Sequence, residues 1–251
     1  MFVRNRCIKV KVGPENFTWA APMIATMGGV LLWLGLCFVN AATGSDLIDA
    51  AQGFLNSLVA GSSSCIISVI LRTIGDRSLI THFSALIFGM IAGVVSVSAS
   101  CQNIEPWGAF IIGIIGGILY SLMSWIFRRV NIDDPLEAVS SQLVCGVWSL
   151  LAVGFFDDNE GVFQNGDGTL LGIQLLAIIS ILGWSGFFGL VIFGPIALAE
   201  ALRVSQEVEL LGLINSKIAF GGFSLAQNRH IKNWEIETED LSDDDESDED
   251  E

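Results

Sequence analysis

The sequence predicts an all-α polytopic membrane protein with six transmembrane helices. Hydrophobic residues make up 52% of its 251 residues and charged residues only 16%, and the mean hydropathy is +0.61. In soluble domains about a quarter of the residues are charged. Six long runs contain no Asp, Glu, Lys or Arg. All Lys and Arg residues lie before the first run, after the last run, or in every second connection between runs. This is the pattern of a chain that crosses a membrane back and forth with its basic residues on one side.

The first helix is expected at about 17–39, inside the 30 uncharged residues between Glu15 and Asp46. The basic segment before it, residues 1–16, is similar to the start of a signal peptide. Its apolar run far exceeds the usual length of about 7–15 residues, so we expect an uncleaved helix. Each later run also reaches the roughly 20 residues that cross the hydrocarbon layer. We expect the other helices of the transmembrane domain (17–200) at about 50–71, 80–101, 106–127, 136–156 and 169–199.

The fifth helix has the most distinctive beginning. Asp133 and Asp134 stand where the positive end of the helix dipole favours carboxylates. Pro135 suits the first turn, where its missing N–H would have no partner. The 19 residues 138–156 carry no charge, and Gln142 is the conspicuous polar side chain among them. This buried amide either joins helices or lines a pathway.

The distribution of basic residues predicts the orientation. The 12 Lys and Arg residues precede the first helix, follow the sixth, or lie between helices two and three and between helices four and five. The three alternate loops (43–52, 102–106 and 157–168) contain none. The positive-inside rule therefore predicts that both termini are cytoplasmic.

The net charge of −15 comes mostly from the C-terminus. Twelve of the 27 acidic residues lie in 235–251, and without them the net charge is −3. This segment, which follows a cytoplasmic tail (201–234), has too little apolar surface to fold, so we expect it to be disordered. It is either simply solvated or phosphorylated at Ser242 or Ser247, which precede acidic runs. Nothing in the charge pattern indicates a nucleic-acid partner.

Small residues recur at a spacing that lets helix backbones approach closely in lipid, either within one bundle or between subunits. They are Gly89/Gly93, Gly113/Gly117 and Gly183/Gly186/Gly189. The five cysteines show no metal-ligand spacing, and their odd number argues against a full disulfide framework. We expect them to be small packing residues, with no metal and no cofactor.

Few other polar side chains are expected at membrane depth: Asn40, Thr43, Asn56, His82, Gln174 and Ser185. One alternative is an intramembrane serine protease of the rhomboid type, because Gly183-Trp184-Ser185-Gly186 reads Gly-x-Ser-Gly. A nucleophilic Ser needs a base within hydrogen-bond reach. The only His in the expected helices, His82, precedes the Ser, whereas rhomboids place it after. We therefore expect no enzyme.

Several motifs, in order along the chain, point to one family. The run from Asp133 to Val139, followed by Val144 to Trp148, is similar to a signature at the tenth helix of the ammonium transporter family, which includes methylammonium permeases and Rhesus proteins. Gly89 to Cys101, followed by Pro106 and Trp107, resembles the eighth helix and the start of the ninth. Shorter matches are Phe38–Asn40 (sixth helix), Trp184–Gly186 (eleventh helix) and Leu202–Val204 (start of the tail).

The resemblance implies that the chain corresponds to helices six to eleven and the tail of an eleven-helix inverted-repeat transporter. Family members are homotrimers with an ammonium pathway through each subunit in the lipid bilayer. They recruit ammonium at an outer vestibule with aromatic rings and a hydroxyl, then pass ammonia and a proton along an apolar lumen lined by two histidines. The resemblance places the first five helices, with the first pore histidine, before Met1. It also favours the plasma membrane.

The matched pathway positions depart from the family pattern. Gln142 stands at the second pore histidine, Val39 at a gating phenylalanine and Leu36 at a usual tryptophan. Thr43 falls where a Ser hydroxyl contacts the substrate, and Asn40 lies beside it. An amide does not titrate near neutral pH, so Gln142 could bind ammonia but not relay a proton.

We therefore expect ammonium transport by a family member with a degenerate pore. Its missing helices are absent through truncation, or another chain supplies them. The alternative is a transport-inactive membrane partner or sensor subunit of the same family.

Overall fold

The computed structural model describes residues 20–75, 79–130, 136–165 and 168–198, together with Ile132 and Asp134. Two compact units divide the chain, Met1–Gly186 and Phe187–Glu251. Several expectations fall outside the described residues: the basic start (1–16), the cytoplasmic tail (201–234), the acidic end (235–251), and Asp133, Pro135, Ser242 and Ser247. All regular elements among the described residues are helices, so the predicted all-α class is confirmed.

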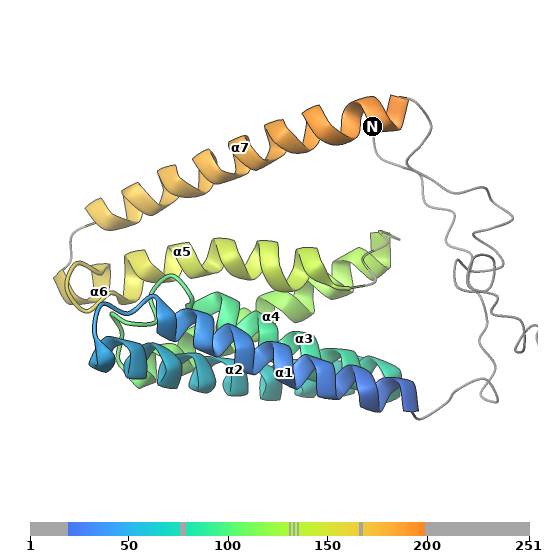
Figure 1. Cartoon of the computed structure of the whole chain (residues 1–251), viewed down its shortest axis with the longest axis horizontal. Helices are drawn as coiled ribbons and strands as arrows, with labels where there is room; N and C mark the ends of the chain where they lie inside the picture. The colour runs from blue at the N-terminus through green and yellow to red at the C-terminus, as the bar shows by residue number, and fades with distance from the viewer. Residues whose placement is uncertain are drawn as a thin grey trace, which may run out of the picture. The chain divides into compact units, whose positions relative to one another are not determined.

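The helices of the first unit form a bundle (Figure 1). They are α1 (Ala20–Ala42), α2 (Leu47–Gly75), α3 (Leu79–Val97), α4 (Pro106–Val130), the π-helix η2 (Val139–Val144) continuing into α5 (Cys145–Phe156), and the short α6 (Val162–Asn165). The last helix, α7 (Thr169–Leu198), crosses from the first unit into the second. Among the described residues, five helices are long and apolar enough to cross a membrane, and α3 is a shorter apolar helix. The chain is therefore a multi-pass membrane protein.

Helix α2 packs against α1, α3 and α4, and α3 also packs against η2 and α5. The buried face of α2 carries small side chains, with Ala60 fully buried at the meeting point of three helices. A Cβ added at Gly93 of α3 or at Gly113 of α4 would collide with Ala60. The glycines predicted to allow close approach do so here within one chain. The spaces beside Gly183, Gly186 and Gly189 of α7 are open in the structure.

The bundle has two ends, one beside Thr43 and one beside Arg72. The Thr43 end is where α1 finishes and α2 and α4 begin, and the Arg72 end is where α2 and α4 finish. At the Thr43 end, the Asp46 carboxylate accepts from the backbone N–H groups of Ile48 and Asp49 at 2.9 Å. Such capping satisfies donors that the first turn of a helix leaves unpaired, and it fixes where α2 begins.

Several helix boundaries differ from the expected ones. Helix α2 continues past residue 71 to Gly75, and α3 ends at Val97 because a turn follows. The fifth helix begins after Glu137 instead of at residue 136. The Asp134 carboxylate accepts from the N–H groups of Ala138 and Val139, at 2.9 and 3.0 Å, so the helical turn starts there. Glu137 has a positive φ of 45°, which breaks any helix running through it.

Candidate functional site

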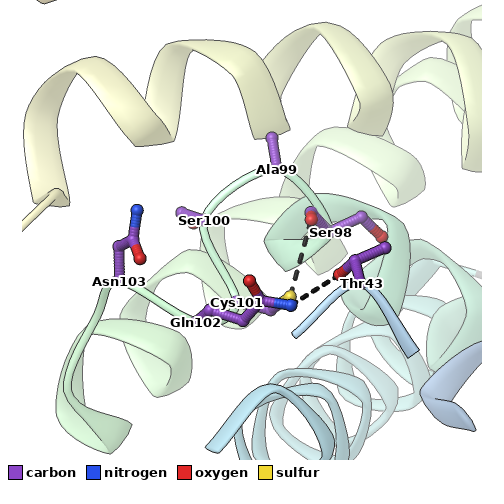
Figure 2. Close-up of a pocket in the computed structure, with 7 residues that line it drawn as sticks. All are labelled: Thr43, Ser98, Ala99, Ser100, Cys101, Gln102 and Asn103. Carbon is purple, nitrogen blue, oxygen red and sulfur yellow. Dashed lines mark hydrogen bonds between the residues drawn. The ribbon is translucent and has the colours of Figure 1, made fainter. Parts of the chain in front are cut away.

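A polar pocket of about 260 Å³ lies at the Thr43 end of the bundle (Figure 2). Its lining consists of Thr43, at the end of α1, and the loop Ser98–Asn103 between α3 and α4. None of these side chains is charged. The pocket therefore offers hydroxyl, amide and carbonyl groups to a small polar ligand.

The hydroxyl of Thr43 has a defined direction. Its Oγ1 donates to the backbone oxygen of Asn40 at 2.7 Å and accepts from Nε2 of Gln102 at 2.6 Å. Since a hydroxyl has one proton and two lone pairs, one lone pair of Thr43 Oγ1 stays available. Thr43 is exposed. It can therefore accept one more hydrogen bond but has no proton left to donate.

Buried amides fix the loop that forms the pocket. Nδ2 of Asn56 donates to the backbone oxygens of Cys101 and Ile104, both at 2.8 Å, and Asn56 is fully buried in α2. Asn40 is also buried, and its Nδ2 donates to Ser57 Oγ at 2.9 Å. Of the polar residues that the sequence placed in the membrane, Asn40 and Asn56 thus hold helices and loop together.

Acidic residues surround the Thr43 end. In the described loops and helix starts there (43–52, 98–106 and 157–161) they are Asp46, Asp49, Glu105, Asp157, Asp158 and Glu160, with no Lys or Arg. Asp157 is buried, and its carboxylate accepts from Asn103 Nδ2 at 3.2 Å, which links this acidic loop to the pocket. A rim of one sign raises the local concentration of ions of the opposite sign. The Thr43 end therefore favours cations.

Gln142 lies in the π-helical turn η2, and its side chain is exposed, as are its neighbour Leu143 and Val139. The two residues before it, Ser140 and Ser141, are buried against the bundle. A π-helical turn is rare and often marks a functional site. The buried polar group expected from the sequence is thus presented outward from the described bundle.

The other matched positions lie on α1, one or two turns before Thr43. Val39 is 59% exposed and Leu36 is half-buried. Val39 and Leu36 thus lie on α1 and Thr43 follows directly after its last residue, whereas Gln142 stands on a separate element at the start of the fifth helix.

A buried ionic cluster at the Arg72 end has no counterpart in the expected site. Arg72 is 3% exposed, and its Nη2 donates to Glu137 Oε1 at 2.9 Å and to Ser124 Oγ at 2.6 Å. The Tyr120 hydroxyl donates to the same carboxylate. Arg72 was expected in a loop. The sequence held one sign of this, because the 22 uncharged residues between Asp49 and Arg72 are followed by a single basic residue that could extend α2 by another turn.

The residues of the rhomboid alternative do not form a nucleophile–base pair. His82 Nε2 lies 3.2 Å from Thr73 Oγ1, so its ring is engaged at the Arg72 end. Ser185 is exposed on α7, and Gln174 on the same helix is half-buried. The cysteines Cys37, Cys65, Cys101 and Cys145 are free thiols, and three of them are buried, as expected for packing residues.

Known proteins resemble this chain over most of its length. A model of the Ammonium Transporter Family matches residues 1–221. "Ammonium transporter 3" of Dictyostelium discoideum is 32% identical over 227 residues, which cover 81% of this chain and 51% of that protein. "Ammonium transporter 1 member 1" of Solanum lycopersicum is 26% identical, covering 80% of this chain and 46% of that protein.

Two solved structures share the fold. One, titled "Sensor Amt Protein", is 28% identical with a TM-score of 0.69, covering 79% of this chain and 49% of that chain. The crystal structure of Saccharomyces cerevisiae Mep2 is 23% identical with a TM-score of 0.59, covering 65% and 41%. The chain spans about half the length of the relatives it matches. Because the family model matches most of its residues, the chain belongs to the ammonium transporter family.

Proposed function

We propose that the chain forms the second part of an ammonium pathway, corresponding to helices six to eleven and the tail of an eleven-helix transporter. The observation that carries this proposal is the family match over residues 1–221. The remaining helices complete the pathway, either in the same polypeptide or in another chain. Exposure of Gln142 supports this assignment, because an amide facing lipid would cost several kcal/mol and calls for a covering element.

Ammonium enters at the Thr43 end. The acidic rim attracts the cation, and Thr43 Oγ1 accepts a hydrogen bond from its N–H. The Thr43 hydroxyl already donates its proton to the backbone oxygen of Asn40, so this position favours a ligand that donates a hydrogen bond. Ammonium can donate from each of its four N–H groups. Val39 and Leu36 replace aromatic side chains that would attract a cation through their rings, so recruitment here depends on oxygen atoms.

Beyond the entrance, the pore departs from the family pattern at Gln142, which stands at the position of the second pore histidine. Its amide binds ammonia or water by donating and accepting, but it carries no proton through. The pore of this chain is therefore degenerate, because the side chain at position 142 cannot transfer a proton. Any flux in it depends on groups outside the described helices or on ammonia alone.

The assembly we propose is a homotrimer in the plasma membrane, with both termini cytoplasmic. The absence of Lys and Arg from the loops of the Thr43 end supports that orientation. The broad exposed apolar surface of α7 supports contact with lipid or with neighbouring subunits. Ser242 and Ser247 in the acidic end would then be open to cytoplasmic kinases.

A second function is a transport-inactive partner or sensor subunit. One observation favours it: the likeness to the structure titled "Sensor Amt Protein" extends over 79% of this chain. In a sensor, ammonium binding at the Thr43 end would be read by a partner instead of leading to flux. Binding without flux separates this reading from the first.

The test compares Thr43→Val with Thr43→Ser. Methylammonium uptake is measured in a yeast strain lacking its own ammonium permeases, with the chain produced together with the first five helices of a full-length relative. Loss of one hydrogen bond to a charged ligand costs about 1.5–3 kcal/mol, so Thr43→Val should raise KM at least about tenfold. Thr43→Ser and the distant control Thr73→Val should stay within about twofold. An unchanged KM in Thr43→Val would remove Thr43 from the pathway.

A further inference from the structure

The ionic cluster at the Arg72 end joins three elements of the bundle. Arg72 comes from α2, Tyr120 and Ser124 from α4, and Glu137 from the segment before η2. Arg72 Nη2 reaches both carboxylate oxygens of Glu137, at 2.9 and 3.2 Å. The remaining guanidinium nitrogens, Nε and Nη1, are buried without a partner. Glu137 is therefore the one close counter-ion of a buried charge among the described residues.

Glu137 lies two residues before the π-helical turn η2 and is hydrogen-bonded to it. Its backbone oxygen accepts from Ser141 N at 2.9 Å and from Ser141 Oγ at 2.8 Å. Its φ of 45° is a conformation that a side chain with Cβ rarely adopts, so other contacts must hold it there. The bonds from Arg72 and Tyr120 to its carboxylate are among those contacts.

The far side of η2 is anchored as well. Cys145 is buried, and its Sγ donates to the backbone oxygen of Gly116 on α4 at 3.6 Å. Gln142 thus stands, exposed, between an anchor at Glu137 and an anchor at Cys145. A π-helical turn holds more residues than an α-helical turn, so relaxation of η2 to an α-helix would turn the side chain of Gln142 to another direction.

We propose that the Arg72–Glu137 pair holds η2 in its π form and thereby sets the direction of Gln142. Both are positioning residues, since they act through η2. The placement of Gln142 is argued from the cluster alone, and only its role in the pathway rests on the proposed function. The chain supplies a matched control: Arg128 lies 4.0 Å from Glu137 Oε1 but is 44% exposed and makes no buried contact to it.

The experiment measures how fast a membrane-impermeant maleimide labels a cysteine introduced as Gln142→Cys in the full chain. Mass spectrometry of the labelled peptide separates this site from the native cysteines. We expect Arg72→Gln to change the labelling rate at least tenfold. Arg128→Gln should leave it within twofold, and Arg72→Lys, which keeps the charge, should restore most of the original rate.

A second probe, Val39→Cys on α1, separates local from global effects. Its labelling rate should be the same with and without Arg72→Gln. Equal changes at both probes would overturn the proposal, because the pair would then stabilise the whole bundle instead of η2. Equal rates for Arg72→Gln and Arg128→Gln at position 142 would overturn it too. Labelling reports neither transport nor ammonium binding, so its failure is distinguishable from failure of the proposed function.

Discussion

The contact of Ala60 with Gly93 and Gly113 allows a sharp prediction about stability. A Cβ at Gly113 would lie 2.7 Å from Ala60 Cα, and a Cβ at Gly93 would lie 2.7 Å from Ala60 C and 2.6 Å from Ser64 Cβ. Ordinary carbon–carbon contacts are at about 3.5–4.0 Å. Each new methyl group is therefore about 1 Å too close to backbone atoms of α2, which cannot move aside by rotating a side chain.

Gly93→Ala must push α3 from α2, and Gly113→Ala must push α4 from α2. Overpacking of this kind typically costs about 1–3 kcal/mol. We expect the upper part of that range, because the obstacle is backbone and because separated helices also lose contacts around Ala60. Alanine favours a helix over glycine by about 1 kcal/mol, which offsets part of the cost. The expected net loss is about 2 kcal/mol for each variant.

Gly35→Ala is the matched control, since Gly35 lies in α1 with nothing within 4 Å of an added Cβ. Unfolding of the purified chain by SDS in mixed micelles, followed by tryptophan fluorescence, measures all three variants against the original chain. Gly35→Ala should be neutral or slightly stabilising. If Gly113→Ala and Gly35→Ala unfold at the same SDS fraction, close approach of α4 to α2 does not hold the bundle together.

Two further predictions concern buried and exposed amides. Asn56→Leu leaves the backbone oxygen of Cys101 without its amide donor, while that of Ile104 keeps only the bond from Gln52, and should cost about 1–3 kcal/mol in the same SDS assay; an unchanged midpoint would show that water replaces the amide at no cost. Gln142→His, in the chain completed with the other helices, should add a dependence of methylammonium uptake on pH near the imidazole pKa of about 6.5. A flat pH profile in the histidine variant would place position 142 outside the pathway.

The helices were predictable from the sequence because charge and apolarity alone mark them. Each run that lacks Asp, Glu, Lys and Arg contains a helix where the structure describes it, although the third run continues past the end of α3 into the loop Ser98–Asn103. The family was predictable as well, since its motifs are local. Helix ends were harder: Pro135 suits a first turn, but the positive φ of Glu137 and the cap from Asp134 start the helix later.

The candidate site was predictable only in part, because contacts between distant segments leave no local trace. Thr43 could be named from its position, yet the loop that completes its pocket is held by Asn56, more than 40 residues away. The charge of Arg72 predicts a loop residue, and its ion pair with Glu137 forms only when the chain folds. The stripe at Gly183, Gly186 and Gly189 looks like those of α3 and α4 in sequence, but an added Cβ at each of these three positions would meet nothing within 4 Å.

The most direct test of a two-part ammonium pathway is methylammonium uptake in the permease-deficient yeast strain, with the chain alone and with the first five helices of a relative. We predict saturable uptake only when both parts are present. Saturable uptake with the chain alone would contradict the account, because a complete pathway would then lie within these helices. Absence of uptake in both cases would contradict the transport role itself.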